Sequence, residues 1–300
     1  MNTTLIAYLQ LMRPANIITA IADILAGVAV AIAWHSGSDS LTFIPNEIGW
    51  LILSTIGLYG GGVVFNDVFD AKLDAVERPE RPIPSGRASK SGAIILGITL
   101  LLGGILAAWQ FSEIAAIIAS FVAFLALLYD AWGKHQNIFG PINMGFCRGG
   151  NLLLGVSIIP EALDHYYLLA IIPVIFIAAV TMVSRGEVNG GNKIAIISGG
   201  ILYLMVISLL GMGLSFLPNY TPIQALPFTL LFAYLVYPPL YKAFKSLKPQ
   251  DVGKAVKAGV LSLIVMDAAI AAGFYNLYYS LGVLILLPIS IFVAKLFAVT

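Results

Sequence analysis

NDVFDAKLDAVERPERPIPSG, residues 66–86, is a charged stretch at the end of an apolar segment. It holds five carboxylates and two arginines in a chain that is 59% hydrophobic and only 10% charged. Asp67, Asp70 and Asp74 are spaced by three and then four residues, so on a helix they fall within an arc of roughly 60°. Three carboxylates on one face repel one another unless a cation lies among them, and Mg²⁺ prefers oxygen ligands. The spacing therefore predicts a metal-binding helix end.

The rest of the chain is apolar enough to indicate a membrane protein. The mean hydropathy is +0.94 over 300 residues, and apolar runs near the length needed to cross a bilayer recur along the sequence. We expect an all-α, polytopic transmembrane bundle with nine to ten spans around a central cavity. The candidate spans are 15–35, 47–66, 91–109, 112–130, 139–158, 166–184, 193–214, 224–243, 255–274 and 278–297. The whole chain, residues 1–300, is expected to form a single domain.

The basic residues predict the orientation of these spans. All 16 lysines and arginines are assigned to one side of the membrane, with Lys134 and Arg148 flanking the start of the fifth span, and the opposite gaps contain none. Because basic residues favour the cytoplasmic side, both termini and the acidic stretch are predicted to be cytoplasmic, in the cell (inner) membrane. The apolar residues of the first twelve recur at helical spacing, which favours a short amphipathic helix on the membrane surface. We expect no nucleic-acid partner.

The second half of the acidic stretch predicts a basic loop. Pro79, Pro82 and Pro84 cannot continue the helix. Arg78, Arg81 and Arg87 supply forked donors suited to phosphate oxygens, close to carboxylates suited to Mg²⁺. One pocket is therefore predicted to hold a metal–diphosphate complex, although these charges could also simply pair with one another at the water interface.

The same stretch resembles the first signature of the UbiA superfamily of intramembrane prenyltransferases, NDxxDxxxD followed by PxRP. The segment LMRPANIITAIADILAG, residues 11–27, is similar to the first helix of that family. The resemblance implies a prenyl diphosphate bound through Mg²⁺ at the cytoplasmic mouth and a lipid-soluble or interfacial acceptor within the bilayer. It implies that Asp67, Asp70 and Asp74 bind the metal. The substrate-binding residues it implies are Asn16, Asn66, Arg78, Arg81, Tyr129, Lys134, Arg148, Asn151, Arg185 and Asn189.

One loop departs from the family pattern. Family members usually carry a second acidic motif, DxxxD, after the sixth helix, whereas this chain reads SRGEVNGGNK over residues 184–193. Only Glu187 is a carboxylate, and Gly191 stands where the second is expected. Glu187 is either a surviving ligand of a second metal or an ion-pair partner of Arg185. The loop leaves open an alternative function, a membrane component that handles or translocates a lipid or metabolite precursor without catalysing prenyl transfer.

Two carboxylates lie well inside expected spans, away from the span ends. Asp23 is in the first and Asp267 in the ninth, and carboxylates inside lipid usually face a cavity or a partner. For Asp23, a structural role within the bundle is the safer interpretation. Ion coupling in a secondary transporter is a further alternative, but no inverted repeat supports it and the charged stretch lies at the membrane face rather than the midplane.

Overall fold

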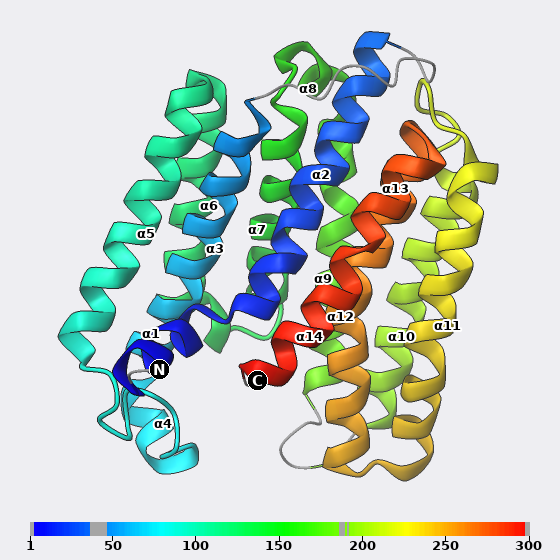
Figure 1. Cartoon of the computed structure of the whole chain (residues 1–300). Coiled ribbons are helices and arrows are strands. Elements are labelled where there is room, and N and C mark those ends of the chain that lie inside the picture. Colours follow the sequence, from blue (N-terminus) through cyan, green and yellow to red (C-terminus); the bar gives the residue numbers. More distant parts are fainter. Residues whose placement is uncertain (1–2, 37–46, 186–189, 191, 298–300) are drawn as a thin grey trace.

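The computed structural model describes residues 3–36, 47–185, 190 and 192–297, and within them every regular element is helical (Figure 1). The long helices stand side by side as one bundle, and both termini lie at the same end of it (Figure 1). The α-helices are α1 Thr3–Met12, α2 Pro14–Ser36, α3 Ile48–Phe69, α4 Ala71–Glu77, α5 Lys90–Phe111, α6 Glu113–Ala131, α7 Phe139–Val156, α8 Pro160–Tyr166, α9 Ile171–Ser184, α10 Lys193–Ser208, α11 Pro222–Ser246, α12 Pro249–Phe274, α13 Leu277–Leu284 and α14 Leu286–Leu296. Three short turns of other helix types, η1 Gly133–His135, η2 Tyr167–Ala170 and η3 Leu209–Gly213, connect or extend them.

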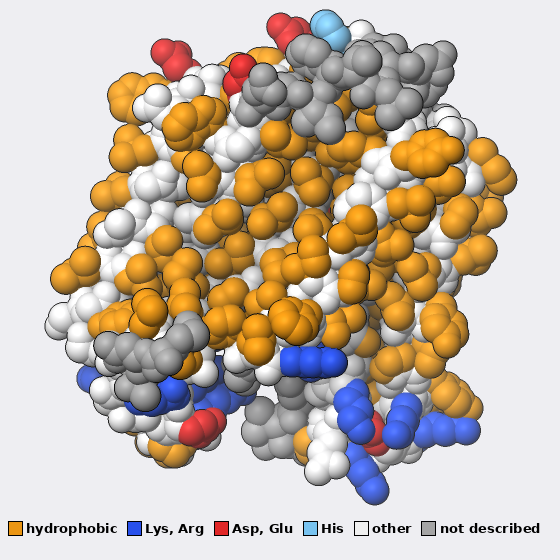
Figure 2. Space-filling model, in the orientation of Figure 1, with side chains coloured by type: hydrophobic (Ala, Val, Ile, Leu, Met, Phe, Trp, Pro, Cys, Tyr) orange, Lys and Arg blue, Asp and Glu red, His pale blue; other side chains and the backbone are white. Residues whose placement is uncertain are grey.

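The predicted membrane architecture is confirmed. Among the described residues, nine helical segments are long and apolar enough to cross a membrane. The expected span not among these nine is the fifth, 139–158, which corresponds to α7; this helix carries Arg148 and two asparagines and packs among the others. Apolar side chains cover most of the flank seen in Figure 2, as expected for a lipid-facing surface. The chain is therefore an integral, multi-pass membrane protein.

Short polar caps explain why helices can follow one another so closely. Ser112 is the single residue between α5 and α6, and its extended backbone ends one helix and begins the next. Its hydroxyl accepts a hydrogen bond from the backbone N–H of Ala115 at 3.1 Å. Asn276 caps α13 in the same way through the N–H of Tyr279. Because such caps satisfy free N–H groups at a helix start, they allow these sharp reversals.

The centre of the bundle depends on a close crossing of α2 and α7. A Cβ added to Gly27 would lie 2.2 Å from the carbonyl oxygen of Leu152, and one added to Gly155 would lie 2.3 Å from that of Ile24. Glycine therefore lets the two backbones touch. The crossing brings Asp23, one turn before Gly27, against Asn151, one turn before Gly155.

The predicted N-terminal helix is present as α1. Arg13 has a positive φ of 50°, and Pro14 begins α2 directly after it. Ala7 and Leu11 of α1 are buried in a small core with Val64 and Val68 of α3, while Leu5 is exposed. This helix therefore packs against α3, and the bend at Arg13 turns that side chain toward the end of α3.

Basic side chains gather at one end of the bundle, the lower end in Figure 2, where both termini lie. The opposite end shows acidic side chains and a histidine on the face drawn. This separation agrees with the alternation of charged gaps in the sequence. We call the end that carries the basic residues the basic end.

Candidate active site at the basic end of the bundle

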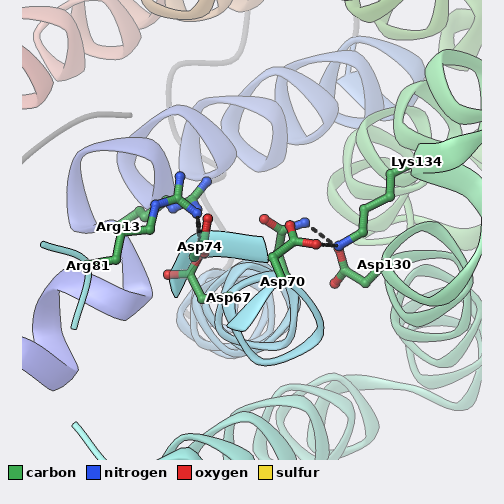
Figure 3. Close-up of polar contacts among 8 residues, drawn as sticks. Arg13, Asp67, Asp70, Asp74, Arg81, Asp130 and Lys134 are labelled. Atoms are coloured by element: carbon green, nitrogen blue, oxygen red, sulfur yellow. Dashed lines mark hydrogen bonds and ion pairs between the residues drawn. The ribbon is translucent and has the colours of Figure 1, made fainter. Parts of the chain in front are cut away.

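Aspartates and basic side chains from four segments meet where α3 reaches the basic end (Figure 3). Arg13 Nη2 lies 2.7 Å from Asp67 Oδ1. Arg81 Nη1 lies 2.8 Å from Asp74 Oδ2 and 3.3 Å from Asp67 Oδ1, so it bridges two carboxylates. Asp70 points the other way and pairs with Lys134 (Figure 3). We refer to these six residues as the mouth cluster.

The helical spacing of the aspartates is largely retained. The backbone N–H of Asp70 bonds to Asn66 and that of Asp74 to Asp70, so the hydrogen-bond ladder continues where α3 passes into α4. Helix α4 ends at Glu77, and the proline-containing turns beyond it return Arg81 toward Asp74. The predicted helix followed by a basic loop is therefore confirmed. The prediction that all three aspartates share one face is wrong, because Asp70 separates α3 from α4 and its side chain points away from the other two, toward Lys134.

Two residues of this site were not predicted. Arg13 lies in the segment that resembles the family's first helix but was not predicted to belong to the site, and Asp130 lies within an expected span. Asp130 is buried and accepts a hydrogen bond from the side-chain amide of Asn66 at 2.8 Å. The available signals were the position of Arg13 just before the first span and that of Asp130 one turn before Lys134.

A cavity of about 420 Å³ opens beside the mouth cluster. Its polar end includes Arg13, Asn16, Asn66, Tyr129 and Asp130. The other lining residues are mostly apolar and come from α3, α6, α7, α9 and α12; they include Leu58, Val63, Val122, Met144, Ile177, Val180, Val260 and Leu263. The cavity thus combines a charged entrance with an apolar interior, as expected for the site of an amphiphile with an anionic head.

Arg148 and Asn151 also line this cavity but lie deeper than the mouth cluster. The Arg148 guanidinium lies 5.1 Å from the ring centroid of Tyr59. Tyr59 precedes Asn66 by seven residues on α3, which is about 10 Å along a helix. Arg148 Nη1 pairs with Asp23 Oδ2 at 2.6 Å, and the amide of Asn151 donates to the same oxygen at 2.9 Å.

The remaining predicted residues have different positions. Arg78 is half-buried and has no ion-pair partner within the part of the chain that the structure describes. Arg185 is exposed and donates to the backbone oxygen of Asn137, and it is not among the cavity-lining residues. Glu187 and Asn189 lie outside the described residues.

The mouth cluster has the donor chemistry for Mg²⁺, although its carboxylates now contact basic side chains. Within the described ranges no three His, Cys, Asp or Glu side chains converge closely enough to hold a metal ion. Asp67, Asp70 and Asp74 nonetheless supply only oxygen donors, which suits a hard cation. Each is neutralised by Arg13, Arg81 or Lys134, which are donors suited to phosphate. The residues therefore fit a metal–diphosphate pair in composition.

The fold and site together define a helical membrane protein with an acidic and basic cluster at the mouth of an intramembrane cavity. The model of the UbiA prenyltransferase family matches residues 23–189, more than half of the chain. The chain belongs to this family.

Curated relatives of the chain are archaeal enzymes named digeranylgeranylglyceryl phosphate synthase. The enzyme of Methanosarcina mazei is 32% identical over 57% of this chain and 62% of its own length. That of Methanosarcina barkeri is 28% identical over 53% of this chain and 56% of its own length. The chain thus spans less than two thirds of these two relatives. The enzyme of Thermococcus kodakarensis is 26% identical over 89% of this chain and 96% of its own.

Solved structures support the fold. An apo UbiA homologue from Aeropyrum pernix K1 superposes with a TM-score of 0.69 at 16% identity, over 85% of this chain and 96% of that one. A UbiA homologue from Archaeoglobus fulgidus bound to DMAPP and Mg²⁺ gives a TM-score of 0.62 at 15% identity, over 88% and 99% of the two chains.

Proposed function

We propose that this protein is a Mg²⁺-dependent intramembrane prenyltransferase, which moves a prenyl group from its diphosphate to a lipid-soluble or interfacial acceptor. The observation that carries the proposal is the placement of three aspartates and three basic side chains at the mouth of a mostly apolar cavity. A prenyl diphosphate has the matching form, with an anionic head and an apolar tail. The homologue from Archaeoglobus fulgidus was determined with DMAPP and with GPP, each together with Mg²⁺.

The mouth cluster would bind the diphosphate head group once its aspartates and basic side chains separate from one another. Asp67, Asp70 and Asp74 would hold Mg²⁺, which when bound supplies positive charge to the departing diphosphate. Arg13, Arg81 and Lys134, relieved of their carboxylate partners, would then donate to the diphosphate oxygens. Fixed donors of this kind stabilise the charge that develops as the bond between prenyl carbon and diphosphate oxygen breaks.

The inner part of the cavity would bind the tail. Most of its lining residues from α9 and α12 are apolar, and Ile177, Val180 and Leu263 among them are buried. Such a lining excludes water from the allylic carbocation, which would otherwise be captured as an alcohol. Asn66, held by Asp130, and Asn16 line the junction between head and tail and would orient the reacting carbon.

For the acceptor, only a chemical class is proposed. The archaeal relatives are named for a glyceryl phosphate lipid product, which favours an amphiphilic acceptor able to enter from the bilayer. The position of the basic residues favours a cytoplasmic location for the mouth cluster and both termini, in the cell membrane.

The test is a turnover assay with the purified protein in lipid nanodiscs. Wild type with Mg²⁺, labelled geranylgeranyl diphosphate and a membrane lipid extract should release pyrophosphate and yield a labelled lipid. Asp67→Asn and Asp70→Asn should both lose this activity. The matched control is Glu113→Gln, which changes a carboxylate at the start of α6, far from the mouth cluster, and should keep the activity.

One result would replace the enzymatic proposal with the alternative function. If wild type binds the prenyl diphosphate with Mg²⁺ but releases no pyrophosphate and labels no lipid, the cavity handles a precursor without transferring it. The departure from DxxxD in residues 184–193 is the sequence feature that motivates this comparison.

A further inference from the structure

Behind the inner wall of the cavity, α2, α7 and α12 bury an unusual set of charges. Asp23 and Asp267 are both 0% exposed, and Arg148 is 6% exposed. Asp267 lies within the electrostatic reach of both Asp23 and Arg148. Arg148 and Asn151 face the cavity, whereas the two carboxyl groups do not line it. We call Asp23, Arg148, Asn151 and Asp267 the inner cluster.

Asp23 and Arg148 of the inner cluster lie about halfway along a bilayer-sized length of their helices. Asp23 follows Pro14, the first residue of α2, by nine positions, and Arg148 follows the start of α7 by nine as well. At 1.5 Å per residue both lie about 14 Å from the basic end of their helices, close to half of a hydrocarbon core of about 30 Å. Water therefore does little to stabilise charged side chains at this depth.

Within the cluster, the two carboxyl groups have different surroundings. Asp23 Oδ2 accepts from the Arg148 guanidinium at 2.6 Å and from the Asn151 amide at 2.9 Å, which are the contacts of an ionised carboxylate. Neither oxygen of Asp267 has a hydrogen-bond partner among the described residues, and the second oxygen of Asp23, Oδ1, is also without a donor. One guanidinium thus faces two carboxyl groups.

The net charge of the inner cluster indicates whether one of its two carboxyl groups is protonated. If both carboxyl groups were ionised, the cluster would carry a net charge of −1 with no exposure to water, which is strongly unfavourable. One proton on Asp267 removes that charge. The same proton also provides the missing donor, because an O–H of Asp267 can bond to Asp23, its neighbour across the α2–α12 contact.

We propose that Asp267 carries a bound proton and that Asp267 and Asp23 are positioning residues, which together hold the Arg148 guanidinium in the cavity wall. Asp23 supplies the charge, Asp267 supplies a neutral hydrogen-bond donor, and the hydroxyl of Thr19 accepts from the other terminal nitrogen of Arg148. The net charge behind the cavity is then zero. An anionic substrate is then not repelled by the inner cluster, whereas an unprotonated Asp267 would repel it.

The first test reads the proton directly by infrared spectroscopy in nanodiscs. Wild type should show the C=O stretching band of a protonated carboxylic acid, and labelling the aspartates with ¹³C in the side-chain carboxyl group should shift it. The band should disappear in Asp267→Asn and remain in Asp251→Asn, a position in the first turn of the same helix that pairs with Lys242. The proposal fails if labelled wild type has no such shifting band, or if the band is unchanged in Asp267→Asn.

The second test asks how the cluster acts on the cavity, and it rests on the proposed function for its probe, geranylgeranyl diphosphate with Mg²⁺. In Asp267→Asn the side-chain amide keeps the volume and the neutral charge of a protonated carboxyl group. This variant should therefore bind the probe within about threefold of wild type. Asp23→Asn removes the counterion of a buried guanidinium and should weaken binding at least about tenfold, as should Arg148→Gln. Equal losses in Asp267→Asn and Asp23→Asn would overturn the proposal.

Two further results separate this inference from other accounts. If wild type does not bind the probe, the proposed function fails, whereas the infrared band still decides the state of Asp267. If NaCl raises the melting temperature of wild type more than choline chloride does, and Asp267→Asn abolishes the difference, then the carboxyl groups hold Na⁺ and the proton is ruled out.

Discussion

The two charged regions of this protein are built from the same side chains but are held in different ways. In the mouth cluster, the paired side chains keep between 6% and 21% of their surface exposed, and they come from segments that include a turn-rich loop. In the inner cluster, Asp23 is fully buried and lies one turn from a crossing where two helix backbones touch. The mouth can therefore exchange ionic partners, and the interior cannot.

This difference assigns different tasks to the two regions. The mouth pairs are only slightly exposed, but a metal ion can take over the carboxylates while a diphosphate takes over the basic side chains, so the exchange leaves no charge unpaired. A buried pair is expensive to break, because removal of one partner leaves an uncompensated charge. We infer that the mouth cluster performs binding and chemistry, whereas the inner cluster fixes the shape and charge of the cavity.

The largest effect is expected at the helix crossing. Gly155→Ala places a methyl group 2.3 Å from the carbonyl oxygen of Ile24. The two backbones must then separate, which disrupts the inner cluster, so we expect a loss of about 3 kcal/mol or more in unfolding free energy, or no folded protein. Differential scanning calorimetry and size-exclusion chromatography would measure this.

Gly103→Ala on α5 is the matched control for that change. A Cβ there meets nothing within 4 Å, and alanine favours a helix over glycine by roughly 1 kcal/mol in water. Stability should stay the same or rise. Gly155→Ala protein as stable as the control would show that the close crossing does not hold the interior.

A smaller effect is expected at the mouth from Arg81→Lys. Arg81 bridges Asp67 and Asp74 through one nitrogen, and lysine keeps the charge but loses the planar fork of donors. The dissociation constant for the Mg²⁺–prenyl diphosphate complex should rise about tenfold, which corresponds to about 1.4 kcal/mol. Titration calorimetry would measure it.

Arg87→Lys tests whether such a loss belongs to the site rather than to the loop. Arg87 lies in the same loop and contacts Gln10, Ser85 and the backbone of Glu80 instead of the aspartates. Its replacement should leave substrate affinity near that of wild type. If both substitutions weaken binding equally, then Arg81 acts through loop structure and not through direct contact.

The smallest effect is expected from Arg78→Gln. Because Arg78 has no ion-pair partner among the described residues, its loss should leave the melting temperature unchanged. If it reaches the diphosphate as the family resemblance implies, affinity should fall by roughly threefold, the size of one exposed ionic contact. A lower melting temperature with unchanged affinity would instead make Arg78 a structural residue.

Much of the fold was predictable because its determinants are local. Apolar length indicated the spans, and Ser112 and Asn276 lie at the short breaks between consecutive expected spans. The acidic helix end and the basic loop were likewise readable from spacing and prolines. Arg13 and Asp130 were missed because their partners, Asp67 and Asn66, lie 54 and 64 residues away in the sequence.

The depth of Arg148 and Asn151 was also beyond local reasoning. A resemblance at the level of motifs implies that they contact substrate, but only the crossing at Gly27 and Gly155 places them beside Asp23. The same crossing explains why a carboxylate is tolerated inside the first span. The partnership of Asp23 and Arg148 depends on tertiary packing between α2 and α7.

The measurement that tests the central claim most directly is the Mg²⁺ dependence of prenyl diphosphate binding. Titration calorimetry in nanodiscs should show binding of geranylgeranyl diphosphate to wild type with Mg²⁺, and binding should be lost with EDTA and in Asp70→Asn. Glu113→Gln should bind as wild type does. Binding of equal strength with and without Mg²⁺, and in Asp70→Asn, would contradict the account, because the mouth aspartates would then hold no metal.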